Sequence, residues 1–92
     1  MSFEVKTEWT VNPLTEAADT LKISSNYKIK NYKVLVRDDQ NDWNTDTQVI
    51  GWCSWKQNKV EMNDDGSATI KASLYNESHD RIRSCKIVAN IE

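Results

Sequence analysis

Cysteine and histidine are scarce in this chain of 92 residues, which holds two cysteines and one histidine. Cys53 and Cys85 are too few for the dense disulfide framework of a small secreted domain. Either one bridge or two buried thiols fits this count, and the lack of a visible leader favours thiols. A lone histidine, His79, with two distant cysteines also excludes a zinc finger.

Long apolar runs and an excess of positive charge are lacking too. The longest apolar run, residues 34–36, is far shorter than the roughly 20 residues that a membrane span needs. The first residues hold no apolar segment of a signal peptide, which leaves the location unknown and slightly favours the cytoplasm. A formal net charge of -2 argues against binding of nucleic acids, because such binding depends on lysine and arginine at phosphates.

Glycine and proline, at two residues and one residue, are few for a chain with many turns. Asparagine and aspartate are abundant and suit turns, because both tolerate left-handed backbone conformations. Hydrophobic residues make up 38% of the chain and charged residues 28%, which is an ordinary globular composition. This length and composition predict one domain that spans residues 1–92.

Alternation of apolar and polar residues runs through most of the chain and is typical of half-buried strands. The clearest case is residues 3–11, where every second residue from Phe3 to Val11 shares one strand face. Further strand segments are predicted at 21–23, 27–29, 32–36, 47–56, 60–62, 68–74 and 85–91. Because residues 27–29 and 32–36 can be one strand with a bulge, these segments amount to six or seven short strands. Their number and regular spacing predict an all-β fold, a small antiparallel β-sandwich.

Several connections between these segments can also be predicted. A change of parity near residues 30–31 predicts a bulge or a turn. Residues 57–58 predict a turn, and residues 63–66, Asn-Asp-Asp-Gly, predict a hairpin with a type I′ turn. Residues 47–56 are apolar on both faces, which fits a strand that is covered on both sides or one that presents a face to a partner.

One segment fits two structures. Leu14, Ala17, Ala18 and Leu21 follow at helical spacing after an Asn-Pro pair that suits a helix start. One short helical turn near residues 13–21 is therefore predicted, with a loop that tucks its two leucines into the core as the alternative.

Catalytic and metal chemistry find little support in the sequence. No nucleophile stands at a spacing that requires contact with His79, so no catalytic residue is assigned. Alternate polar residues from Asp38 to Asn44 resemble the start of an EF-hand loop. Trp43 and Val49, however, occupy the places of its glycine and glutamate. We therefore expect a protein that is not an enzyme, with no metal and no cofactor.

The polar loop around Trp43 is the strongest candidate for a binding site. An indole among carboxylates and amides can stack on the apolar face of a sugar while its neighbours bond the hydroxyls. Core packing is the alternative for both Trp43 and Trp52, because so short a chain needs large apolar residues. The candidate ligand-binding residues are Asp38, Asn41, Asp42, Trp43, Asn44 and Trp52.

These residues predict a non-catalytic, lectin-like module that binds carbohydrate through a Trp/Asp/Asn loop. The alternative is a protein–protein interaction module, such as an inhibitor, an effector or a component of a particle surface, because tryptophan is enriched at interface hot spots. The expected partners are thus a carbohydrate or another protein, a second copy of this chain included.

Two family resemblances involve the segments that follow residue 31. Residues 79–84, His-Asp-Arg-Ile-Arg-Ser, resemble the end of a βγ-crystallin motif, which implies calcium binding where Ser or Thr stands in the place of Arg83. The run from residues 32–36 through Ile70 and Tyr75 to Ile87 is similar in strand order to the H-type lectins. That similarity implies a six-stranded sandwich that binds N-acetylgalactosamine. Both resemblances imply an all-β fold.

Overall fold

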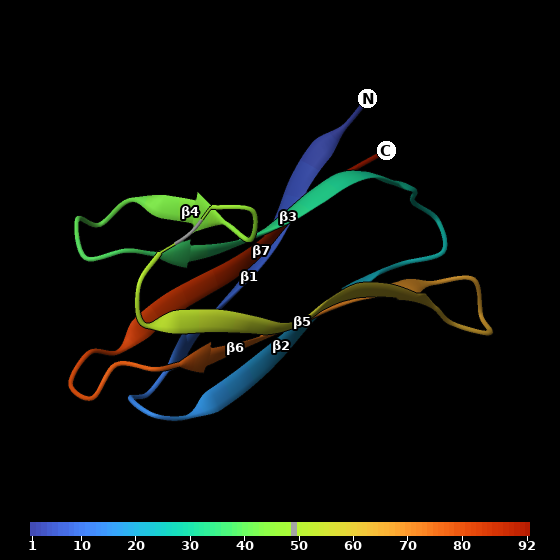
Figure 1. Ribbon diagram of the computed structural model, residues 1–92. Helices are drawn as coiled ribbons and strands as arrows, with labels where there is room; N and C mark the ends of the chain where they lie inside the picture. The colour runs from blue at the N-terminus through green and yellow to red at the C-terminus, as the bar shows by residue number, and fades with distance from the viewer. Residues whose placement is uncertain (49) are drawn as a thin grey trace.

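The computed structural model describes residues 1–48 and 50–92, which form a sandwich of two antiparallel sheets (Figure 1). Within these residues the strands are β1 (Phe3–Val11), β2 (Glu16–Ile23), β3 (Ile29–Arg37), β4 (Trp43–Thr45), β5 (Cys53–Met62), β6 (Ala68–Asn76) and β7 (Arg83–Ile91). The predicted all-β sandwich of six or seven strands is confirmed. In the same described part of the chain, no helix is long and apolar enough to cross a membrane.

The two sheets have the strand orders β1-β7-β3-β4 and β2-β6-β5. Along one side of the sandwich β1 lies against β2 of the other sheet. Side-chain bonds link this pair. The Trp9 indole N–H donates to the Ala17 carbonyl at 3.1 Å, and the Thr7 hydroxyl donates to the Asp19 carboxylate at 2.8 Å. These bonds close that side of the sandwich.

The core lies between β6 and β7, the middle strands of their sheets. Both strands bury alternate residues along their whole length, as the apolar pattern of the sequence predicted. Ile70, Leu74, Ile87 and Val34 are fully buried, and two adjoining clusters of such side chains fill the space between the sheets. Each such side chain stabilises the fold by about 1.5–3 kcal/mol.

The first strand matches its prediction except at its beginning. Trp9 packs against both core clusters and meets Trp55 of the facing sheet edge-on, with ring centroids 6.3 Å apart. Phe3, predicted to anchor the same face, is instead 45% exposed. Its ring meets the ring of Tyr27 edge-on, with centroids 5.3 Å apart.

The helical turn predicted near residues 13–21 is wrong, because strand β2 starts at Glu16 and pairs with β6 as far as Ile23. Pro13 and Leu14 form a tight turn in which Leu14 has a φ of 56° and is 48% exposed. The loop alternative is wrong for Leu14 as well, although Leu21 does pack against the core. Pairing with β6 bonds the backbone groups on one edge of this strand along its whole length, and on the other side the Ala17 carbonyl accepts the Trp9 indole N–H. A helix this short would be marginal alone.

The predicted irregularity near residues 30–31 is confirmed as a bulge, because the pairing of β3 with β7 shifts between Ile29 and Asn31. The turn predicted at residues 57–58 is wrong. That segment carries a second shift, between Trp55 and Gln57, inside one continuous strand β5. A bulge and a turn both interrupt the apolar alternation, so the sequence pattern alone does not separate them.

The hairpin at residues 63–66 is confirmed, although its turn is not type I′. The Gly66 N–H donates to the Asn63 carbonyl at 3.0 Å. Among residues 63–66, only Gly66 has a positive φ, of 86°. A type I′ turn needs positive φ at both central residues, and Asp64 and Asp65 do not have it. The loop is therefore three residues long, with glycine at the position that needs left-handed freedom.

Trp9→Ala should lower the free energy of unfolding by about 3 kcal/mol. The substitution leaves a cavity between the sheets and removes the bond to the Ala17 carbonyl. Urea unfolding measures the change. Phe3→Ala, on the same strand but exposed, is the control and should cost about 0.5 kcal/mol. Equal costs for the two variants would contradict this account of the core.

Cys85 should resist thiol reagents in the native protein and react once the chain unfolds. Both cysteines are free, Cys85 is fully buried, and burial raises the pKa of its thiol to about 12. Cys53 is half-buried, and burial raises its pKa as well, so it should label slowly. Mass spectrometry after timed alkylation counts the labels, and rapid double labelling of the native protein would contradict the prediction.

Candidate functional site

The loops opposite the chain termini gather at one end of the sandwich (Figure 1). We call this the loop end and define it as residues 12–15, 38–42, 50–52 and 77–82. The segments come from four different connections between strands. Three adjoining hollows open among the last three segments.

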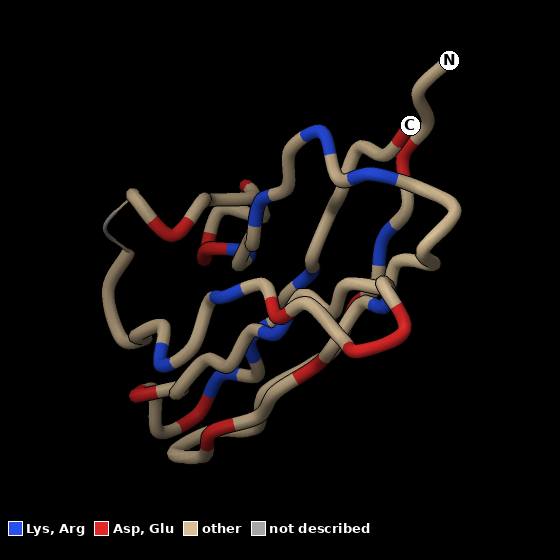
Figure 2. The backbone as a smooth tube through the Cα atoms, turned by 90° about the vertical axis from the view of Figure 1, so that its right-hand side faces the viewer, with Lys and Arg blue, Asp and Glu red and all other residues tan. Residues whose placement is uncertain are grey.

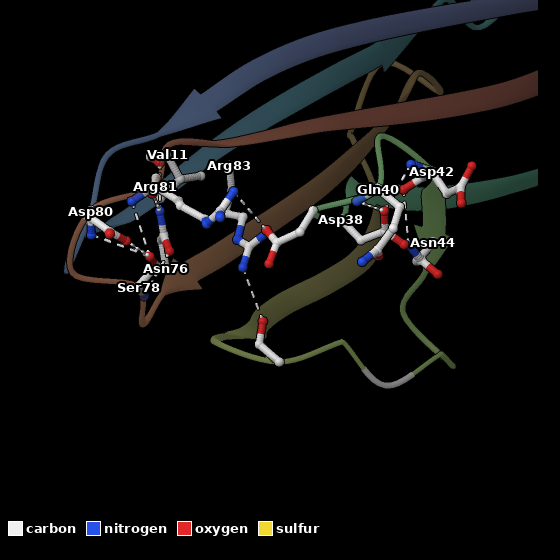
Figure 3. Close-up of polar contacts among 12 residues, drawn as sticks. Val11, Asp38, Gln40, Asp42, Asn44, Asn76, Ser78, Asp80, Arg81 and Arg83 are labelled. Carbon is white, nitrogen blue, oxygen red and sulfur yellow. Dashed lines mark hydrogen bonds and ion pairs between the residues drawn. The ribbon is translucent and has the colours of Figure 1, made fainter.

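A buried arginine organises the loop end. Arg83, the first residue of β7, pairs with Val11 of β1 and so faces inward, where it is only 4% exposed. Its guanidinium donates to the Asp39 carboxylate at 2.8 Å and to the Gly51 carbonyl at 3.3 Å (Figure 3). Arg81 lies 3.6 Å from the same Asp39 oxygen. One carboxylate thus faces two guanidinium groups, and the buried Nε of Arg83 has no partner.

A buried asparagine fixes the loop between β6 and β7. The Asn76 side-chain amide donates to the carbonyls of Val11, at 3.0 Å, and Arg81, at 2.6 Å. Its oxygen accepts the Ser78 N–H at 3.0 Å. The Ser78 hydroxyl in turn donates to the Asp80 carboxylate at 3.1 Å (Figure 3). This network holds the backbone on which Arg81 stands.

The turn between β3 and β4 contains three of the predicted ligand-binding residues, and their contacts, with those of Asn44 on β4, mainly stabilise the turn itself. The Asp38 carboxylate accepts the N–H groups of Gln40 and Asp42 and the side-chain amide of Asn44, each within 2.9 Å. These bonds lower the pKa of Asp38, and the bond from the Asn44 amide has the largest effect. Asn41 occupies the left-handed position, with a φ of 67°. Asp42 is exposed and lines none of the hollows.

Trp43 does not lie in an open loop. It starts the short strand β4 opposite Arg37 and is half-buried on the outer face of the four-stranded sheet. Its ring lies 4.6 Å from the Arg37 guanidinium carbon and 4.2 Å from the Lys86 ammonium. Trp43 and Trp52 line different hollows.

Trp52 is the exposed tryptophan of the loop end. The strand predicted over residues 47–56 begins only at Cys53, and Gly51 and Trp52 form a turn before it; Val49 lies outside the described residues. Trp52 is 64% exposed with a φ of 66°, and its carbonyl accepts the Glu77 N–H at 2.8 Å. The indole therefore stands at the surface on a fixed backbone.

Trp52 borders two polar hollows of about 360 and 370 Å³. The first is lined by Asp39, Ser78, His79, Asp80 and Arg81. The second is lined by Asp38, Asp39, Gln40, Asn44, Ile50, Gly51 and Arg83. Asp39 belongs to both, so the two hollows meet at the Arg83–Asp39 ion pair.

The structure brings three of the six predicted site residues, Asp38, Asn44 and Trp52, around one hollow. Asn41 lines the neighbouring hollow, which holds about 320 Å³. Sequence reasoning missed Asp39 and the residues of β7 and its preceding loop as parts of this site. The resemblance of residues 79–84 to a known motif was the one signal that pointed to that segment.

Comparison with known proteins finds no matching family model, no matching curated protein and no matching solved structure. Across residues 1–48 and 50–92, no three His, Cys, Asp or Glu side chains gather closely enough to hold a metal ion.

Asp39→Ala should lower the free energy of unfolding by about 2 kcal/mol, because it leaves the buried Arg83 charge without its carboxylate. Arg83→Met in the same chain should recover part of that loss, since the unpaired charge is then gone. Urea unfolding of the single and double variants gives the coupling. Asp42→Ala, which removes an exposed carboxylate from the same turn, is the control; if it costs as much as Asp39→Ala, the ion pair has no special role.

Proposed function

We propose that this protein is a non-catalytic, lectin-like module that binds a carbohydrate at the loop end, with Trp52 as the stacking surface. The observation that carries the proposal is the exposed, left-handed Trp52 between two polar hollows. An indole ring packs on the C–H face of a pyranose, and the hollows on either side supply groups for its hydroxyls.

The backbone at Trp52 supports a role in binding. A left-handed conformation costs a non-glycine residue about 1–2 kcal/mol. Gly51, the neighbouring residue, has no positive φ, and a Cβ there would meet no atom within 4 Å. The left-handed position, where glycine would be unstrained, is therefore occupied by Trp52, and the glycine is the residue before it. Folding gives no reason for that choice, whereas a ligand that covers the indole does.

The polar groups around Trp52 suit a ligand that both donates and accepts hydrogen bonds. Carboxylates of Asp39 and Asp80 can accept from sugar hydroxyls, and the half-exposed Arg81 guanidinium can donate to them. Asp39 is held by Arg83, so its position is set before a ligand arrives. Such preorganisation lowers the entropy cost of binding.

Protein–protein interaction is the second candidate, and a different observation favours it. Ile82 is 62% exposed and lines a hollow together with Arg81, so two large apolar side chains, Ile82 and Trp52, flank an arginine at the loop end. Tryptophan and arginine in one patch are typical of interface hot spots.

Trp52→Gly separates ligand binding from folding. Glycine removes the indole and relieves the left-handed strain, so the urea midpoint should stay or rise. A glycan array with the native protein identifies a ligand, and titration calorimetry compares the variants. Loss of the stacked ring should weaken sugar binding by about tenfold or more.

Ile82→Ser is the matched control. It removes an exposed apolar side chain from the loop end without touching the hollows beside Trp52, so sugar binding should stay unchanged. Full sugar binding by Trp52→Gly, or no glycan bound by the native protein, would contradict the proposal. A protein partner whose binding needs both Ile82 and Trp52 would favour the second candidate.

A further inference from the structure

The outer face of the four-stranded sheet, which we define as the side chains of β1, β7, β3 and β4 that point away from the core, carries positive charge on an acidic protein. The strand register places four cations and two carboxylates there. They are Lys6, Lys33, Arg37 and Lys86, with Glu4 and Glu8. The whole chain has a net charge of -2, so the remaining residues carry the excess of carboxylates, and Figure 2 marks both kinds of residue along the backbone.

Three of these cations have no carboxylate partner in the described part of the chain. Lys6 lies 3.8 Å from Glu8, whereas Lys33, Arg37 and Lys86 form no ion pair there. Lys86 pairs with Leu35, which stands between Lys33 and Arg37 on β3. Lys86 is therefore the diagonal neighbour of both Lys33 and Arg37, and diagonal positions on adjacent strands lie about 7–8 Å apart. The three residues form a staggered row.

Trp43 holds two of the three cations in place. The Arg37 guanidinium and the Lys86 ammonium both lie against its ring, and a hollow of about 320 Å³ opens beside them. Glu8, Thr10 and Ser84 are the other polar residues that line this hollow. The Nε of Arg37 is buried without a partner in the described part of the chain. Glu8 stands opposite Lys86 in the register, but it forms an ion pair with Lys6 and not with Lys86. Cations that are ordered before binding and form no ion pair are well suited to an anion.

We propose that this outer face binds an acidic polysaccharide, whose repeated sulfate or carboxylate groups contact Lys33, Lys86 and Arg37 in turn. The face is a separate surface from the hollows beside Trp52, so the inference goes beyond the carbohydrate site of the loop end. A polymer with spaced anionic groups matches a staggered row of separated cations on the face of a sheet. Trp43 contributes by ordering the cations and not by stacking on the ligand.

A single-stranded nucleic acid fits the same face less well. Proteins that bind such strands combine basic grooves with aromatic rings that are free to stack on bases. Trp43 is the one aromatic side chain that the register places on this face, and two cations already lie against its ring.

Lys33→Gln/Lys86→Gln tests the proposal, with Lys22→Gln/Lys56→Gln as the control. Both variants lose two positive charges, but Lys22 and Lys56 stand on β2 and β5 of the other sheet. Fluorescence polarisation with labelled heparin and alginate fragments at low salt measures binding to sulfate and carboxylate polymers. The test variant should bind at least one of them about tenfold more weakly than the native protein, and the control within about twofold.

Added salt should weaken native binding, since the contacts are between exposed charges. The thermal midpoint shows that each variant is folded. No binding of either polymer by the native protein, or equal losses in the two variants, would overturn the proposal. Tighter binding of oligothymidylate than of either polysaccharide would overturn it in favour of a nucleic acid. Loss of heparin binding in Trp52→Gly alone would place acidic sugars at the loop end and overturn it too.

Discussion

The contact on which the loop end depends is the ion pair between the buried Arg83 and Asp39. A guanidinium that is almost excluded from water must have a carboxylate close by, because an unpaired buried charge is strongly destabilising. This requirement brings the turn after β3 to the start of β7, and the additional bond to Gly51 brings in the connection before β5. Three segments far apart in the sequence are thus drawn to one point, and the hollows beside Trp52 are the spaces left between them.

The fold was predictable where burial is repeated locally along a strand. β6 and β7 bury every second residue, so their alternation could be read directly. The segment near residues 13–21 could not, because Ala17 and Leu21 lie four residues apart and satisfy both a helix and a strand period. The deciding factor is pairing with β6, whose paired residues lie from 45 (Ile23 with Ala68) to 59 (Glu16 with Tyr75) positions away, and a local pattern does not contain this. β4 was not predicted for a different reason, because its three residues are too few to show a period.

The candidate site was less predictable than the fold. Asp38 and Asn44 were found because they are near each other in sequence, and they turn out to bond each other. Asp39 and Arg83 are 44 residues apart, and nothing in either neighbourhood indicates that they meet. Trp43 shows the opposite error. A polar sequence around an indole predicted exposure, whereas Arg37 and Lys86 reach it from neighbouring strands and cover part of its ring.

The four tryptophans of this short chain lie in three different environments. Trp9 and Trp55 meet edge-on between the sheets, and the Trp9 indole N–H is bonded, so packing accounts for both. Trp43 is half-buried under two cations and orders them. Trp52 is exposed and has a left-handed backbone conformation, which is strained for a residue with a side chain. The residue before it is a glycine that does not adopt such a conformation. Since a domain of this size has little stability to spare, the exposed and strained indole supports the proposal of a ligand at the loop end.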